Sequence, residues 1–218
     1  PIPKHYSLGP GDEVIVTPYS MSASATCVLV YNAIPVFADI STDTFCLDPE
    51  AVRACITPRT KAIVVVDLRG SGVYADNVEI IVGDSAGLGV IWIADWADDM
   101  VHVSSHHATL GKDAEIGHVN VTLGGDVVRT TATVRYTAPG GDAQMLGTYF
   151  ADDGQHFESR LLVDHAHPNC KSDVLYKGAL QGDPDSGKPD AHTVWIGDVL
   201  IRAAATGTDT FEVNRNLV

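Results

Sequence analysis

The spacing of apolar residues changes along this chain near Gly70. Before that point, short apolar runs alternate with segments of helical character. Beyond it, apolar and polar residues alternate at every second position in segment after segment. A period of two is typical of strands, and a period near four is typical of helices. We therefore expect two unlike pieces, an α/β segment at residues 1–69 and a β-rich segment at residues 70–218.

The first piece shows an alternating order of strand and helix signals. Strands are predicted at residues 13–17, 35–40 and 62–68, with a helix over 21–32 between the first two. A second helix is predicted to run to about Ile56, with Asp48 as its N-cap, Pro49 at its first position and Glu50 in its first turn. The order β-α-β-α-β predicts a parallel α/β unit.

The second piece carries repeated strand signals. Val128, Thr130, Ala132, Val134 and Tyr136 alternate with more polar residues, so they predict a strand with one dry face. Residues 119–123 repeat this pattern, with valine and leucine on the expected dry face. Turn signals recur roughly every thirteen to sixteen residues. This spacing suits either an antiparallel meander or a stacked solenoid, and periodicity leaves both open.

Charge and cysteine content limit the function classes. The net charge is −14, and a surface this acidic repels phosphate backbones and anionic lipid, so we expect neither nucleic acid nor membrane as a partner. No apolar run reaches the eighteen or so residues of a membrane helix, and no secretory signal is recognisable. The four cysteines form no CxxC pair, which indicates reduced thiols and a cytoplasmic location.

Histidines are the first candidates for chemistry. His102, His106 and His107 lie close together, and His118 follows. On a strand, His102 and His106 share one side while His107 points away. Such a pair lacks a third metal ligand nearby in the sequence. Both a structural role and a role as ligands or at an interface remain open.

A second group lies between residues 164 and 170. His165 and His167 share one side of a strand, and Cys170 follows a turn. Histidine and cysteine together suit a soft or borderline metal, so these three residues are our metal-ligand candidates. The alternative is a strand end closed by a polar turn. No nucleophile turn, Walker A loop or GxGxxG motif is present, so we assign no catalytic and no cofactor-binding residue.

The first piece resembles the DegT/DnrJ/EryC/StrS sugar aminotransferases, which are pyridoxal phosphate (PLP) enzymes. The resemblance covers about residues 8–68. It is carried by Leu8–Val16, Pro18–Ser20, Pro35–Asp39, Leu47–Val52 and Ile56–Ile63. The family's phosphate-binding Gly-Thr segment, its aspartate for the pyridine nitrogen and its Schiff-base lysine have no counterpart in this sequence. The resemblance therefore implies an incomplete, inactive aminotransferase relative, and PLP is not expected.

The second piece resembles the SufD family, the scaffold subunits of the SUF iron–sulfur cluster assembly system. The resemblance covers about residues 70–218. It is carried by Gly70–Asn77, His102–Gly111, Val163–Ser172, Tyr176–Leu180, Val194–Val199 and Thr208–Leu217.

This second resemblance implies a right-handed parallel β-helix that acts without catalysis. It implies a SufB-like subunit and a SufC-like ATPase as partners, with the SufC docking region outside this sequence. It also implies no stably bound cofactor, only a transient iron–sulfur cluster held together with a partner. Two alternatives remain: an inactive PLP aminotransferase relative, and an artificial fusion of two families with no single native function. An isolated α/β segment would expose unpaired strand edges. We therefore expect it to lie against the open end of the solenoid as a cap.

Overall fold

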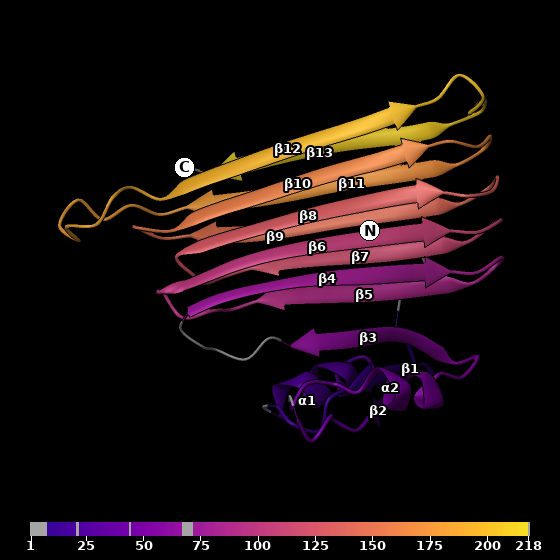
Figure 1. Ribbon diagram of the computed structural model, residues 1–218, viewed down its shortest axis with the longest axis horizontal. Coiled ribbons are helices and arrows are strands. Elements are labelled where there is room, and N and C mark those ends of the chain that lie inside the picture. The colour runs from indigo at the N-terminus through magenta and orange to yellow at the C-terminus, as the bar shows by residue number, and fades with distance from the viewer. Residues whose placement is uncertain (1–7, 21, 44, 67–71, 218) are drawn as a thin grey trace.

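A computed structural model describes residues 8–20, 22–43, 45–66 and 72–217. Within these residues the fold is mainly β, with parallel sheets and two short helices (Figure 1). The elements are β1 (Glu13–Val16), α1 (Ala23–Leu29), β2 (Ile34–Phe37), α2 (Pro49–Cys55), β3 (Thr60–Val66), β4 (Gly72–Val82), β5 (Gly87–Ala94), β6 (Met100–Leu110), β7 (Glu115–Thr122), β8 (Val127–Tyr136), β9 (Asp142–Ala151), β10 (His156–His165), β11 (Lys171–Leu180), β12 (His192–Ile201) and β13 (Asp209–Leu217).

The N-terminal segment is the parallel α/β unit that its sequence predicts. Strand β1 pairs in parallel with both β2 and β3. Asp48 caps α2 as expected, because its Oδ1 accepts a hydrogen bond of 3.0 Å from the backbone N–H of Glu50. Helix α1 is shorter than the predicted segment 21–32, and Met21 lies outside the described residues.

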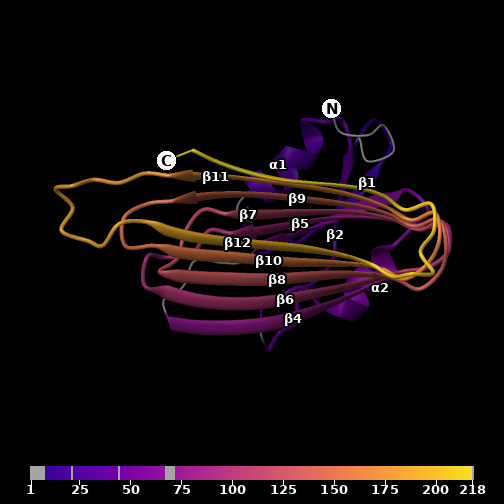
Figure 2. The same ribbon diagram turned by 90° about the horizontal axis from the view of Figure 1, so that it is seen from above.

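From β4 onward, successive strands alternate between two sheets. Strands β4, β6, β8, β10 and β12 form one sheet, and β5, β7, β9, β11 and β13 belong to the other. Each strand therefore pairs in parallel with the strand two places later in the sequence. Strand β4, for example, pairs with β6 and places Asp76 opposite Ser104. Figures 1 and 2 show the strands from β4 to β13 arranged as two facing layers. Parallel pairing throughout excludes the antiparallel meander.

The longer sheet continues into the N-terminal segment. Strand β3 pairs in parallel with β5, and Ile63 lies opposite Val90. The order along this sheet is β13-β11-β9-β7-β5-β3-β1-β2. Strand β3 of the α/β unit therefore covers the edge of β5 that would otherwise be unpaired. The predicted join near Gly70 lies outside the described residues, and the division into residues 1–69 and 70–218 stays a prediction.

Side chains that point between the two sheets form the main core. Strand β8 follows its predicted alternation, with Val128, Ala132, Val134 and Tyr136 buried. The expectation for residues 119–123 is wrong. Asn120 and Thr122 point into the core and are buried, whereas Leu123 is 48% exposed. Alternation shows that a strand has two faces, but it does not show which of the two faces will be buried.

The described part of the chain contains no helix long and apolar enough to span a membrane.

Candidate functional site

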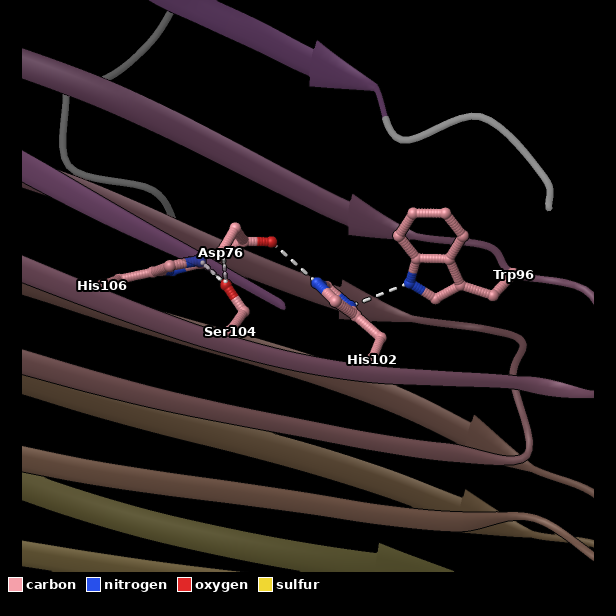
Figure 3. A network of polar contacts seen from close by, with 5 residues as sticks. All are labelled: Asp76, Trp96, His102, Ser104 and His106. Carbon is pink, nitrogen blue, oxygen red and sulfur yellow. Dashed lines mark hydrogen bonds and ion pairs between the residues drawn. The ribbon is translucent and has the colours of Figure 1, made fainter. Parts of the chain in front are cut away.

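A chain of polar side chains lies between the two sheets, near the end that adjoins the α/β segment (Figure 3). Strand β6 contributes three of its members, His102, Ser104 and His106, which point inward because they occupy alternate positions. Asp76 comes from the neighbouring strand β4, and His118 comes from β7 in the facing sheet. Trp96 comes from the loop between β5 and β6. The set therefore connects the two sheets.

Hydrogen bonds join these residues in one continuous line. Trp96 Nε1 donates to His102 Nδ1 at 2.8 Å, and His102 Nε2 lies 2.8 Å from Asp76 Oδ2. Ser104 Oγ donates to Asp76 Oδ1 and lies 2.8 Å from His106 Nε2. The line ends in the facing sheet, where His106 Nδ1 lies 2.9 Å from His118 Nε2.

The partners fix where each proton sits. His102 Nδ1 accepts from the indole N–H, so the ring of a neutral His102 carries its proton on Nε2 and donates it to Asp76. Because Ser104 donates to Asp76, its oxygen accepts from His106 Nε2–H. The bare His106 Nδ1 then accepts from His118 Nε2–H. Every donor in the line therefore points toward the carboxylate of Asp76.

Burial keeps the two inner histidines neutral. Removal from water lowers the pKa of His118 to about 3, and the nearby His106 lowers it further. Burial likewise lowers the pKa of His106 to about 4, against the attraction of the Asp76 carboxylate. Aromatic rings line the same space: Trp92 meets His106 edge-on at 4.5 Å between ring centroids, and Trp96 meets His102 at 4.9 Å. These rings exclude bulk water from the histidines.

The order of groups differs from that of a catalytic triad. In a Ser-His-Asp triad the histidine stands between serine and carboxylate and takes the serine proton. Here Ser104 stands between Asp76 and His106 and gives its hydrogen to the carboxylate. The other histidine on Asp76, His102, is bonded to an indole and not to a hydroxyl. The arrangement can hold or pass a proton, and it does not activate a nucleophile.

The predicted directions of the three histidines on β6 are confirmed. His102 and His106 share the inward side of β6, and His107 points away, with its Nε2 2.9 Å from Ser105 Oγ. Sequence reasoning missed Asp76, Ser104 and Trp96. The spacing between turns could have indicated that Asp76 and Ser104 are neighbours. The two residues are 28 positions apart. This separation equals two strand-turn units, so it places them side by side on adjacent strands.

The three metal-ligand candidates are placed as follows. His165 is fully buried, and its Nε2 lies 2.9 Å from Ser172 Oγ while its ring stacks on Tyr136. Cys170 is also buried, and its thiol contacts the carbonyl oxygens of Ala138 and Pro168 at 3.7 and 3.6 Å. Burial raises the pKa of the Cys170 thiol. His167 is half-buried and lies beyond the end of β10, so the prediction that His165 and His167 share one side of a strand is wrong.

Among residues 8–20, 22–43, 45–66 and 72–217, no three histidine, cysteine, aspartate or glutamate side chains gather in a way that could hold a metal ion. The metal role of His165, His167 and Cys170 stays a prediction.

A cavity of about 510 Å³ lies elsewhere, between the α/β segment and the longer sheet. Its lining includes Tyr31 and Lys61 of the α/β segment, together with Gly89, Val119 and Gln144 of strands β5, β7 and β9. Its volume is in the range of small-molecule pockets. The residues of the polar chain are not among those that line it, so the two features are separate.

Comparison with known proteins gives one family model. Residues 54–218 match the domain described as "SUF system FeS cluster assembly, SufBD core domain". An iron–sulfur cluster assembly SufBD family protein of Mycobacterium leprae is 62% identical over 216 residues, covering 96% of this chain and 55% of the relative. A SufBD family protein of Mycobacterium tuberculosis is 73% identical over 158 residues, covering 72% of this chain and 40% of the relative. The chain spans about half the length of these relatives.

The chain is also similar to aminotransferases. An L-glutamine:2-deoxy-scyllo-inosose aminotransferase of Streptomyces kanamyceticus is 37% identical over 180 residues, which is 80% of this chain and 39% of the enzyme. An L-glutamine:2-deoxy-scyllo-inosose aminotransferase of Streptomyces lividus is 61% identical over 61 residues, which is 28% of this chain and 14% of the enzyme. Among solved structures, an aspartate aminotransferase of Thermus thermophilus is 40% identical over 28% of this chain and 16% of the enzyme, with a TM-score of 0.26. The family model, in contrast, covers all strands from β4 to β13. This chain belongs to the SufBD core family of the SUF iron–sulfur cluster assembly system.

Proposed function

We propose that this protein is a scaffold component of iron–sulfur cluster assembly that acts by binding other SUF proteins. The observation that carries this proposal is the family match over residues 54–218, which takes in the ten strands from β4 to β13. A SufB-type subunit is the proposed direct partner, and a SufC-type ATPase is the proposed third member of the assembly in the cytoplasm. The cluster is cargo, held transiently together with the partner.

The proposed architecture is a right-handed parallel β-helix of the SufD type. Its support is the return of the chain to the same sheet at every second strand, always in parallel. The inward-facing residues of both sheets also share one continuous apolar core. A coil of this kind presents long, regular side faces on which a partner subunit has room to bind.

The proposed role is non-enzymatic. In the polar chain around Asp76, the serine gives its hydrogen to the carboxylate and is not activated by a histidine. Within the aminotransferase-like residues 8–68, the sequence offers no counterpart of that family's Schiff-base lysine. Added PLP should therefore produce no aldimine absorbance band, and borohydride should trap no lysine adduct. A trapped lysine would favour the aminotransferase alternative instead.

A binding experiment tests the scaffold proposal. The tagged chain is mixed with a mycobacterial SufB-type subunit, recovered on the tag and analysed for the partner. We expect the SufB-type subunit to be retained, and an unrelated acidic protein of similar charge to be washed away. A far-ultraviolet spectrum of the same sample shows whether the chain is folded. If the chain is folded and the SufB-type subunit is nevertheless washed away, the proposal is wrong.

Iron reconstitution tests the three metal-ligand candidates. Under anaerobic conditions the parent, Cys170→Ala and Cys27→Ala are loaded with ferrous iron and sulfide, and bound iron is measured. Cys27 is exposed and lies on α1, so it serves as the control. If His165, His167 and Cys170 form a site, Cys170→Ala alone holds less iron. Equal iron content in all three proteins removes these residues as ligands.

A further inference from the structure

Three buried polar atoms lie unpaired at the inner end of the polar chain. They are His118 Nδ1, Asn120 Oδ1 and Trp92 Nε1, none of which has a hydrogen-bond partner within the described structure. Their residues are 1%, 2% and 4% exposed. A buried polar atom without a partner costs free energy comparable to a lost hydrogen bond, so three of them together require an explanation.

The pairing of strands places these three residues next to one another. Trp92 on β5 lies directly opposite Asn120 on β7, and both point inward. His118 precedes Asn120 by two positions and shares its side of the strand. The Trp92 ring also meets His106, which is bonded to His118. The unpaired atoms therefore belong to one small region and not to three separate places.

Their chemistry selects one kind of ligand. Trp92 Nε1–H is a donor, whereas Asn120 Oδ1 and the bare His118 Nδ1 are acceptors. A ligand that satisfies all three accepts one hydrogen bond and donates two. An indole N–H cannot ligate a cation, and two lone pairs repel an anion. Water matches the set, and buried waters typically make about three such bonds.

We propose that a buried water molecule binds Trp92, Asn120 and His118 between the sheets, and that it completes the hydrogen-bonded chain to Asp76. The water accepts from Trp92 Nε1–H and donates to Asn120 Oδ1 and His118 Nδ1. It turns a line with an open end into a complete hydrogen-bonded path. The inference goes beyond the scaffold role, and the outcome of the partner-binding experiment does not bear on it.

The water fixes the direction of the whole hydrogen-bonded chain. It donates to His118 Nδ1, and His118 Nε2–H donates to His106 Nδ1. His106 Nε2–H donates to Ser104 Oγ, and the Ser104 hydroxyl donates to Asp76 Oδ1. Both histidines are therefore held as neutral rings with their proton on Nε2.

The path has a defined outer end. The Asp76 side chain is 12% exposed and sits on β4, the edge strand of its sheet, whereas His118 is enclosed. Because burial makes a charged His106 or His118 costly, both rings stay neutral between the water and the carboxylate.

High-resolution crystallography tests the water site with two matched variants. We expect the parent to show a water within hydrogen-bond distance of Trp92 Nε1 and Asn120 Oδ1. Trp92→Phe removes the donor and should lose this water. Trp96→Phe removes an indole that is already bonded to His102, and it should keep the water. An empty site in the parent, or an unchanged water in Trp92→Phe, would overturn the proposal.

Nitrogen-15 nuclear magnetic resonance of histidine-labelled protein tests the direction of the chain. It distinguishes a protonated ring nitrogen from a bare one, and we expect His106 and His118 to carry their protons on Nε2. Ser104→Ala removes the acceptor of His106 Nε2–H and should shift the His106 signals, whereas Ser105→Ala removes the hydroxyl beside His107 and should leave them unchanged. A His118 ring that is protonated on Nδ1 in the folded parent would overturn the proposed water contact.

Discussion

His102 and Asp76 meet diagonally across two parallel strands. The pairing register places His102 opposite Tyr74, yet its Nε2 lies 2.8 Å from Oδ2 of Asp76, two residues farther along β4. The directly opposite partner of Asp76, Ser104, takes the other carboxylate oxygen. One carboxylate thus receives two hydrogen bonds from adjacent inward positions of β6, and it links the strand edge to the interior of the fold.

Removing this carboxylate should destabilise the protein. Asp76→Ala leaves the His102 and Ser104 donors without their acceptor in a mostly buried place, so we expect a loss of about 1–3 kcal/mol in the free energy of unfolding. Glu79→Ala changes an outward residue on the same strand and should stay within about 0.5 kcal/mol of the parent. Urea unfolding measures both. Equal losses in the two variants would show that the carboxylate has no special role.

The two inner histidines should make stability depend on pH. Their folded pKa values, about 4 for His106 and about 3 for His118, lie below the unfolded value of about 6.5. Between these values the unfolded chain binds protons that the folded chain does not. Stability should therefore fall as pH drops below about 6.5, by about 1.4 kcal/mol per unit for each histidine, until the folded pKa is passed.

Histidine variants isolate this effect from other titrating groups. His118→Gln should flatten the fall in stability between about pH 6 and pH 4, because one proton-binding difference is gone. His107→Gln, which changes the outward histidine of β6, should retain the slope of the parent. Chemical unfolding at several pH values gives the slopes. An unchanged slope in His118→Gln would mean that His118 is charged or exposed in the folded state.

A second pH effect involves Asp164 and Arg202. The guanidinium donates from Nε and Nη2 to the two carboxylate oxygens at 2.7 and 2.8 Å, and this lowers the pKa of Asp164. The stabilisation is complete above the unfolded pKa of about 3.9 and disappears as pH falls through the lower folded value.

Thermal melts of Asp164→Asn follow this second effect. The variant should melt below the parent at neutral pH, and the gap should close in strong acid. Asp173→Asn, on the outward side of β11, is the control and should show no gap at either pH. A gap for Asp164→Asn that persists unchanged into strong acid would contradict the ion pair.

Two glycines make room for tyrosine rings on neighbouring strands. Gly147 on β9 lies opposite Tyr176 on β11, and Gly178 lies opposite Tyr149. A methyl group at Gly147 would overlap the ring of Tyr176. Gly147→Ala should therefore cost about 1–3 kcal/mol in unfolding free energy through overpacking. Gly83→Ala, where a methyl group meets no atom within 4 Å, is the control. A parent-like Gly147→Ala would show that the tyrosine moves freely.

Local signals predict the individual elements well. Asp48, Pro49 and Glu50 mark the start of α2 because a cap is decided by a few consecutive residues. The alternation of Val128, Ala132 and Val134 predicts β8 because one face is uniformly apolar. What determines these features lies within a few residues of each one along the chain.

The polar chain depends on distant residues, and sequence reasoning found only its histidines. The shared side of His102 and His106 follows from strand geometry, but their partner Asp76 is set by the register between β4 and β6. The inward direction of Asn120 reverses the expectation from hydropathy, because the space it enters already contains His118 and Trp92. Pairing register and the contents of the core are properties of the assembled sheets.

Sedimentation of the chain with a mycobacterial SufB-type subunit tests the scaffold role most directly. The two proteins are studied alone and mixed at rising partner concentration, with Asp76→Ala included to relate binding to the integrity of the fold. The scaffold account predicts a saturable complex of defined stoichiometry for the parent. If the parent unfolds cooperatively in urea, and is therefore folded, yet sediments as two independent species at every ratio, the account is contradicted.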